Sequence, residues 1–246
     1  MSQPPLIWSE PLIIHSYDVD FSRQATLEAL CRHFLEAAWN HAEALGFGFS
    51  QLARDSKVWV LSRLLLQMRR YPRWGDRIGL NTWPRGTQSL FALREFELLD
   101  AAGQRIGGAT SAWLILDVNS RRPQRVEKYL TPITPVSSTA TDREPEKLPP
   151  CSGNCASSWP VRYTDVDLNG HANSARYIGW LMDSYPADWH QRYAPSLVEL
   201  NYLGESHQGD TLSLRTGQSG PCEFLHSIVK SDQQEACRAR VDWADK

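Results

Sequence analysis

An internal duplication constrains the fold of this chain more than any other feature. Residues 20–34 align without a gap to residues 167–181, with an aspartate at the head of each copy and apolar residues at helical spacing behind it. A second match follows in the same order, where Gly-Asp at 75–76 and at 209–210 each precede alternating apolar residues. Two matches in the same order predict two copies of one fold within the 246 residues, each of ordinary domain size.

Each copy has the pattern of one helix followed by consecutive strands. In the first copy an apolar stripe at helical spacing extends over residues 26–45. Alternating apolar residues predict strands in both halves, over 12–17, 58–68, 77–83, 89–99 and 105–117, and then over 159–163, 196–203, 211–215, 223–229 and 236–243. One helix with consecutive antiparallel strands indicates an α+β fold, with an antiparallel sheet wrapped around a central helix in each half.

The segment 130–158 separates the two copies. It is rich in Pro, Ser, Thr and charged residues and poor in apolar ones, which is typical of a linker on the surface. We therefore expect an N-terminal domain over residues 1–145 and a C-terminal domain over residues 146–246.

Composition narrows the function classes. The apolar share of 41% and the charged share of 22% are those of a soluble globular protein, and no apolar run approaches the roughly 20 residues that span a bilayer. A net charge of −2 argues against nucleic acid as a partner. Five cysteines without framework spacing, and no targeting pattern at the N-terminus, favour a reducing cytoplasm.

The positive charge is unevenly distributed. Arginines crowd two stretches, which suit an acidic partner or a phosphate, although a solvated strand face is the plainer reading for any single one. The stretches hold Arg63, Arg69, Arg70, Arg73, Arg77 and Arg85, and then Arg121, Arg122, Arg125 and Lys128.

Candidate catalytic residues lie just before the second predicted helix. Asp167, Asn169 and His171 alternate, so an extended backbone would point them the same way. The following helix N-terminus favours developing negative charge, and an amide or imidazole there could stabilise a carbonyl oxygen during acyl transfer or hydrolysis. Asp167 or a second carboxylate, Glu205, could act as base.

The first copy lacks these groups. Ser22 stands opposite Asn169, Gln24 opposite His171, and Tyr71 opposite Glu205. Because simple turn-making would be kept in both copies, this asymmetry favours a function for the second set.

Other readings of the motif stay open. Asp and Asn also form turns, Asn173 could cap the helix, and the aspartate shared by both copies favours a partly structural Asp167. His207 is either a second imidazole of the site or a surface residue. Ser206 lacks a Gly-x-Ser-x-Gly context, which disfavours it as a nucleophile.

Residues 167–180 resemble the segment that leads into the second central helix of the acyl-acyl carrier protein thioesterases of plant plastids and bacteria. The stretches 59–63, 71–76 and 82–83 are similar to the N-terminal half of that family. The resemblance implies two tandem hotdog domains and hydrolysis of fatty acyl-carrier thioesters, with Asp167, Asn169, His171 and Glu205 as catalytic residues. The family's cysteine after the glutamate is replaced by Ser206, which favours water activated by a carboxylate over a thiolate.

The resemblance also implies the remaining features of the site. It calls for no metal and no organic cofactor, and it places an acyl-chain tunnel along the first helix, at Leu27, Leu30 and Phe34. The partner is an acidic acyl carrier protein, for which the arginine-rich surface is the expected docking site, and pairing of two chains stays open. Two alternatives are an acyl-coenzyme A thioesterase of the same superfamily and a non-catalytic protein that binds acyl groups or the carrier.

Overall fold

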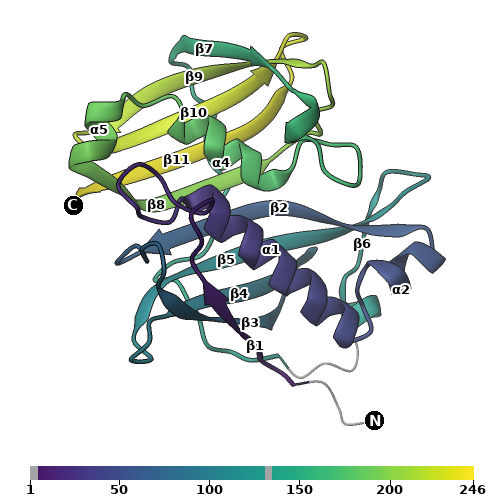
Figure 1. Ribbon diagram of the computed structural model, residues 1–246. Coiled ribbons are helices and arrows are strands. Elements are labelled where there is room, and N and C mark those ends of the chain that lie inside the picture. Colours follow the sequence, from purple (N-terminus) through teal and green to yellow (C-terminus); the bar gives the residue numbers. More distant parts are fainter. Residues whose placement is uncertain (1–4, 131–134) are drawn as a thin grey trace. The chain divides into compact units, whose positions relative to one another are not determined.

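The computed structural model describes residues 5–130 and 135–246. The chain forms two compact units, an N-terminal unit, Met1–Pro145, and a C-terminal unit, Glu146–Lys246. In each unit antiparallel strands form a sheet, and one helix lies across a face of that sheet, α1 in the first and α4 in the second (Figure 1).

The sheet of the N-terminal unit has the order β1-β3-β4-β5-β2, with β6 paired to β5. All of these pairings are antiparallel. The strands are β1 (Trp8–Ile13), β2 (Lys57–Met68), β3 (Arg77–Gln88), β4 (Phe91–Leu99), β5 (Arg105–Asp117) and β6 (Pro123–Gln124). The helices are α1 (Leu27–Ala44), α2 (Phe49–Arg54) and α3 (Glu127–Leu130).

Helix α1 packs on this sheet through its apolar stripe. It begins after Thr26, whose side-chain oxygen accepts a hydrogen bond from the N–H of Ala29 at 3.2 Å. Leu27, Leu30 and Phe34 are at most 3% exposed. Phe34 stacks on Phe96 of β4, with 5.1 Å between the ring centroids. The stripe therefore forms the core between helix and sheet.

The C-terminal unit repeats this topology. Its antiparallel sheet has the order β7-β9-β10-β11-β8, which matches β1-β3-β4-β5-β2 strand for strand. The strands are β7 (Asn154–Pro160), β8 (Tyr193–Tyr202), β9 (Thr211–Gly220), β10 (Glu223–Lys230) and β11 (Glu235–Asp245). The helices are α4 (Ser174–Met182), α5 (Ala187–Arg192) and the short 3-10 helix η1 (Tyr163–Asp165). The predicted α+β fold, a sheet with one central helix in each copy, is confirmed.

Two predicted strands extend too far, and both errors have the same cause. β1 ends at Ile13 rather than at residue 17, and β7 ends at Pro160 rather than at residue 163. In each case an aspartate turns the backbone out of the sheet. Asp18 accepts the N–H of His15 at 2.8 Å, and Asp165 accepts the N–H of Arg162 at the same distance.

The predicted surface linker is also wrong in part. Residues 131–134 lie outside the described residues, but a few of the residues after them are buried. Leu148 is 1% exposed, and its N–H donates to the Oδ1 of Asn201 at 2.8 Å. Cys151 is also buried and its N–H donates to the Oγ of Ser227, while residues from Asn154 onward belong to β7. The prediction used composition alone, and composition gives no information about backbone hydrogen bonds of this kind.

Among the described residues, no helix combines the length and the apolar character that crossing a bilayer requires.

Candidate active site

A tight turn before α4 carries the candidate catalytic residues. The Oδ1 of Asp167 accepts the backbone N–H of Asn169 at 2.8 Å, and the N–H of Asp167 donates to the carbonyl oxygen of His171 at 2.8 Å. The backbone of Gly170 has φ +78°, a conformation that residues other than glycine adopt only at an energetic cost. The Asp167 carboxylate thus holds the turn that carries Asn169 and His171.

The N-terminal unit contains the same turn without the same side chains. The Oδ1 of Asp20 accepts the N–H of Ser22 at 2.8 Å, and the N–H of Asp20 donates to the carbonyl of Gln24 at 2.9 Å. Arg23, at the position of Gly170, also has a positive φ of 63°. Turn-making therefore accounts for both aspartates, as the sequence suggested for Asp167, but not for Asn169 and His171.

Helix capping is done by a neighbouring residue. The Oδ1 of Asn173 accepts the N–H of Ala175 at 2.9 Å and begins α4, as Thr26 begins α1. Asn169 lies on the exposed part of the turn, and His171 is partly exposed. The cap therefore leaves both side chains available for another role.

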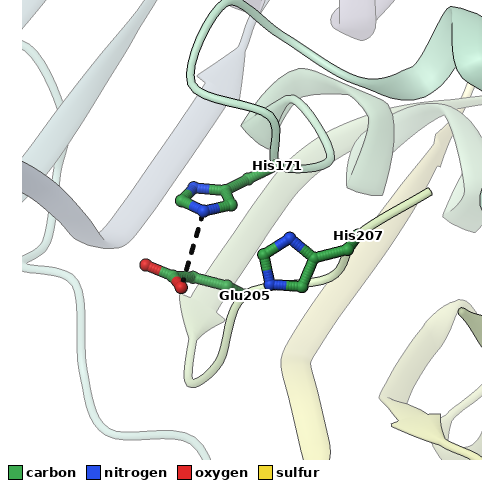
Figure 2. A group of neighbouring side chains, drawn as sticks. All are labelled: His171, Glu205 and His207. Atoms are coloured by element: carbon green, nitrogen blue, oxygen red, sulfur yellow. Dashed lines mark ion pairs between the residues drawn. The ribbon is translucent and has the colours of Figure 1, made fainter.

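A second segment brings Glu205 to the turn. The N–H of Ala172 donates to the carbonyl oxygen of Ser206 at 2.7 Å, which fixes residues 205–207 beside His171. The Nε2 of His171 lies 3.6 Å from the Oε2 of Glu205 (Figure 2). Their side chains are 33% and 39% exposed, so a water molecule can reach both groups. The structure thus brings together two of the predicted catalytic residues that are 34 positions apart in the sequence.

His207 lies beside both His171 and Glu205 (Figure 2). Its ring meets the ring of His171 edge to face, with 4.9 Å between the centroids. Its Nδ1 lies 3.4 Å from the carbonyl oxygen of Gly170, and its backbone N–H donates to the Oδ2 of Asp210 at 2.9 Å. His207 is exposed, as its reading as a surface residue expects, and its ring contacts that of His171.

Ser206 points the other way. It is 1% exposed, and its Oγ accepts a hydrogen bond from the hydroxyl of Tyr177 at 2.9 Å. Burial raises the pKa of Tyr177, so this hydroxyl remains a donor at ordinary pH. The structure gives Ser206 a structural contact rather than access to a substrate.

Lys230 of β10 completes the surroundings, and no pattern in the sequence indicated it. Its Nζ donates to the backbone carbonyl of Glu205 at 3.2 Å and lies 3.5 Å from the Oδ2 of Asp210. The backbone N–H of His207 and the nearby Lys230 lower the pKa of Asp210. The loop that carries Glu205 and His207 is therefore tied to the sheet.

The arginine clusters are partly neutralised within the chain. Arg85 pairs with Glu95 and Glu144, and Arg70 pairs with Asp100 at 2.8 Å. Arg73 and Arg77 are exposed, and neither forms an ion pair within the described ranges 5–130 and 135–246. Only part of the predicted basic surface thus remains available to a partner.

Comparisons with known proteins agree with this arrangement. Residues 5–133 match the model of the acyl-ACP thioesterase N-terminal domain, and residues 152–245 match that of the acyl-ACP thioesterase C-terminal domain. An acyl-ACP thioesterase structure from Bacteroides thetaiotaomicron superposes with a TM-score of 0.90 at 29% identity, and covers 99% of this chain and 100% of the other. The 12:0-ACP thioesterase of Umbellularia californica shares the fold, with a TM-score of 0.86 at 23% identity over 98% of each chain.

Curated relatives point to the same family. The chain is 29% identical to oleoyl-acyl carrier protein thioesterase 2, chloroplastic, of Arabidopsis thaliana, over 97% of this chain and 77% of that protein. It is 26% identical to palmitoyl-acyl carrier protein thioesterase, chloroplastic, of Cuphea hookeriana, over 99% of this chain but only 64% of the relative's length. Its two units are tandem hotdog domains, and the chain belongs to the acyl-ACP thioesterase family.

Proposed function

We propose that this chain hydrolyses fatty acyl thioesters of an acyl carrier protein, giving the free fatty acid and the carrier thiol. The observation that carries the proposal is the pair formed by His171 and Glu205, 3.6 Å apart, whose counterparts in the N-terminal unit are Gln24 and Tyr71. Family membership supports the substrate class. The N-terminal unit then has the catalytically degenerate copy, and the C-terminal unit has the active one.

Each residue of the site has a separate role in this reaction. Asn169 and His171 donate hydrogen bonds to the thioester carbonyl oxygen, where negative charge develops; one such donor is typically worth about 3–4 kcal/mol. Glu205 accepts a proton from water while the water oxygen attacks the carbonyl carbon. The C–S bond then breaks, and the proton passes to the departing thiolate. Asp167 is the less favoured base because its Oδ1 already accepts the N–H of Asn169.

The acyl chain is assigned to the N-terminal unit, along α1. Leu27, Leu30 and Phe34 form a buried apolar stripe on this helix. Burial of each methylene is worth about 0.8 kcal/mol, so the length of such a stripe can set chain-length preference.

The carrier protein is assigned to the exposed arginines. Arg77 is the first residue of β3, and Arg73 forms a bridge with Gln24 of the turn that mirrors the catalytic one. Both are exposed, and an acidic carrier would complement them. A cytoplasmic location and pairing of two chains both stay predictions.

The test compares one acyl group on two carriers. Purified protein is incubated with the acyl-carrier thioester or with the same acyl-coenzyme A, and free acid is measured by gas chromatography. We expect a higher kcat/KM for the carrier thioester. Arg73→Glu and Arg77→Glu should lower that value at low salt, while Arg54→Glu, an exposed arginine on α2, should not.

Three results would redirect the proposal. Equal or higher kcat/KM for the coenzyme A substrate would favour the acyl-coenzyme A alternative. Acyl-carrier binding without any released acid would favour a non-catalytic binding protein. Arginine variants that act alike on both substrates would remove the docking assignment and leave the hydrolase intact.

A further inference from the structure

The C-terminal unit groups two imidazoles and a carboxylate in one partly exposed place. His171, Glu205 and His207 each offer a ligand atom, and these atoms all lie within 4.8 Å of one another. In Figure 2 the two rings face the Glu205 carboxylate from different sides. We propose that this cluster is a binding site for Zn²⁺, and that occupation of the site inhibits hydrolysis.

The hydrogen bonding of His207 prepares it as a ligand. Its Nδ1 faces the Gly170 carbonyl oxygen at 3.4 Å, which favours the tautomer with the proton on Nδ1. The Nε2 then has a free lone pair. A carbonyl oxygen behind a ligating imidazole is the usual arrangement in metal sites, where it fixes the orientation of the ring.

The backbone around the three ligands is already fixed. The N–H of Ala172 bonds to the carbonyl of Ser206 at 2.7 Å, and the N–H of His207 bonds to Asp210 at 2.9 Å. Tetrahedral zinc with ligands at 2.0–2.1 Å requires ligand atoms about 3.3 Å apart. The His171–Glu205 pair is at 3.6 Å, so modest side-chain rotations would bring the set to that spacing.

The donor set selects the ion. Two imidazole nitrogens and one carboxylate oxygen suit zinc, with a water in the fourth position, whereas calcium and magnesium prefer oxygen ligands throughout. The N-terminal unit provides an internal comparison. Its equivalent positions hold Gln24, Tyr71 and Arg73, which offer neither an imidazole nor a carboxylate.

Inhibition rests on the proposed function of the same site. A bound zinc ion would take the lone pair of His171 and the carboxylate of Glu205. Those groups would then be unable to polarise the thioester and accept the proton of the attacking water. His207 has no part in that chemistry, which makes it the residue to vary.

The experiment measures zinc binding and hydrolysis separately. Chelator-treated full-length protein with Cys155→Ser and Cys222→Ser, which remove the accessible thiols, is titrated with ZnCl₂ by calorimetry. The same protein is then assayed for hydrolysis at each zinc concentration. His207→Gln is the test variant, and His15→Gln, an exposed imidazole of the N-terminal unit, is the matched control.

We expect one zinc per chain and progressive loss of hydrolysis in the parent and in His15→Gln. His207→Gln should keep its basal rate within about threefold, while its zinc affinity and its sensitivity to zinc fall at least tenfold. Equal affinity in His207→Gln and the parent, or no binding to the parent, would overturn the site. Tight binding with undiminished hydrolysis would overturn the inhibition, and binding without any hydrolysis in the absence of zinc would instead refute the proposed function.

Discussion

Replacing Ser206 with alanine should lower stability and leave catalysis nearly unchanged. The Ser206 Oγ is buried and accepts the hydroxyl of Tyr177 at 2.9 Å, and Tyr177 itself is 3% exposed. Ser206→Ala leaves that hydroxyl buried without its acceptor, which typically costs about 1–3 kcal/mol. In a chain of this size each kcal/mol of lost stability lowers the melting temperature by about 2–4 °C. Ser206→Ala should therefore lower the melting temperature by roughly 2–12 °C.

Tyr177→Phe provides the control for this prediction. It removes the donor, and the double variant Ser206→Ala/Tyr177→Phe removes both partners, so the double variant should be more stable than the sum of the single losses implies. Melting curves and hydrolysis of an acyl-carrier thioester are measured for all three variants. We expect every rate to stay within about threefold of the parent, because neither side chain has a role in the proposed transition state.

An acyl group trapped on Ser206 would refute this reasoning. So would a hundredfold loss of activity in Ser206→Ala at an unchanged melting temperature, because a structural hydroxyl should affect stability before catalysis.

Three further predictions concern other parts of the chain. Glu205→Gln should lower turnover by about 10²–10⁴-fold without changing the melting temperature, and near-normal turnover would exclude Glu205 as the base. Leu30→Trp on the buried face of α1 should shift the released acids, measured by gas chromatography, toward shorter chains. The preference should change by nearly fourfold for each methylene that the larger side chain excludes. An unchanged profile in a destabilised protein would remove the tunnel assignment. Burial lowers the pKa of His226 from 6.5 to about 4, so the unfolded state binds the proton first as pH falls. The free energy of unfolding should therefore drop by about 2 kcal/mol from this group between pH 7 and pH 5, and urea titrations of His226→Gln should lack that component.

Local patterns in the sequence were sufficient for most of the fold. Helix α1 lies within the predicted 26–45, and β5 has the predicted bounds of 105–117, because both have an apolar periodicity that packing preserves. The linker misled the prediction because its buried residues are held by backbone hydrogen bonds to side chains such as Asn201, and such bonds leave no mark on composition.

The candidate site likewise contains residues that local sequence patterns predict and contacts that they do not. The prediction of Asn169 and His171 rests on the difference from their counterparts in the other copy, and that of Glu205 rests on the matching Gly-Asp turn; their catalytic roles stay predictions. The place of His207 depends on the backbone pairing of Ala172 with Ser206, a long-range contact that no local pattern encodes. Lys230 belongs to β10 and reaches the Glu205 loop only in the folded unit, so its contact could not be predicted from spacing.

The central claim is that one of two structurally equivalent turns is catalytic. Its most direct test compares His171→Ala with Gln24→Ala, the same change at matched positions of the two turns, in hydrolysis of one acyl-carrier thioester. We expect His171→Ala to lose about 10²–10³-fold in kcat with its fold intact, and Gln24→Ala to stay within about threefold of the parent. Equal losses in the two variants, at equal melting temperatures, would contradict the assignment of a single site to the C-terminal unit.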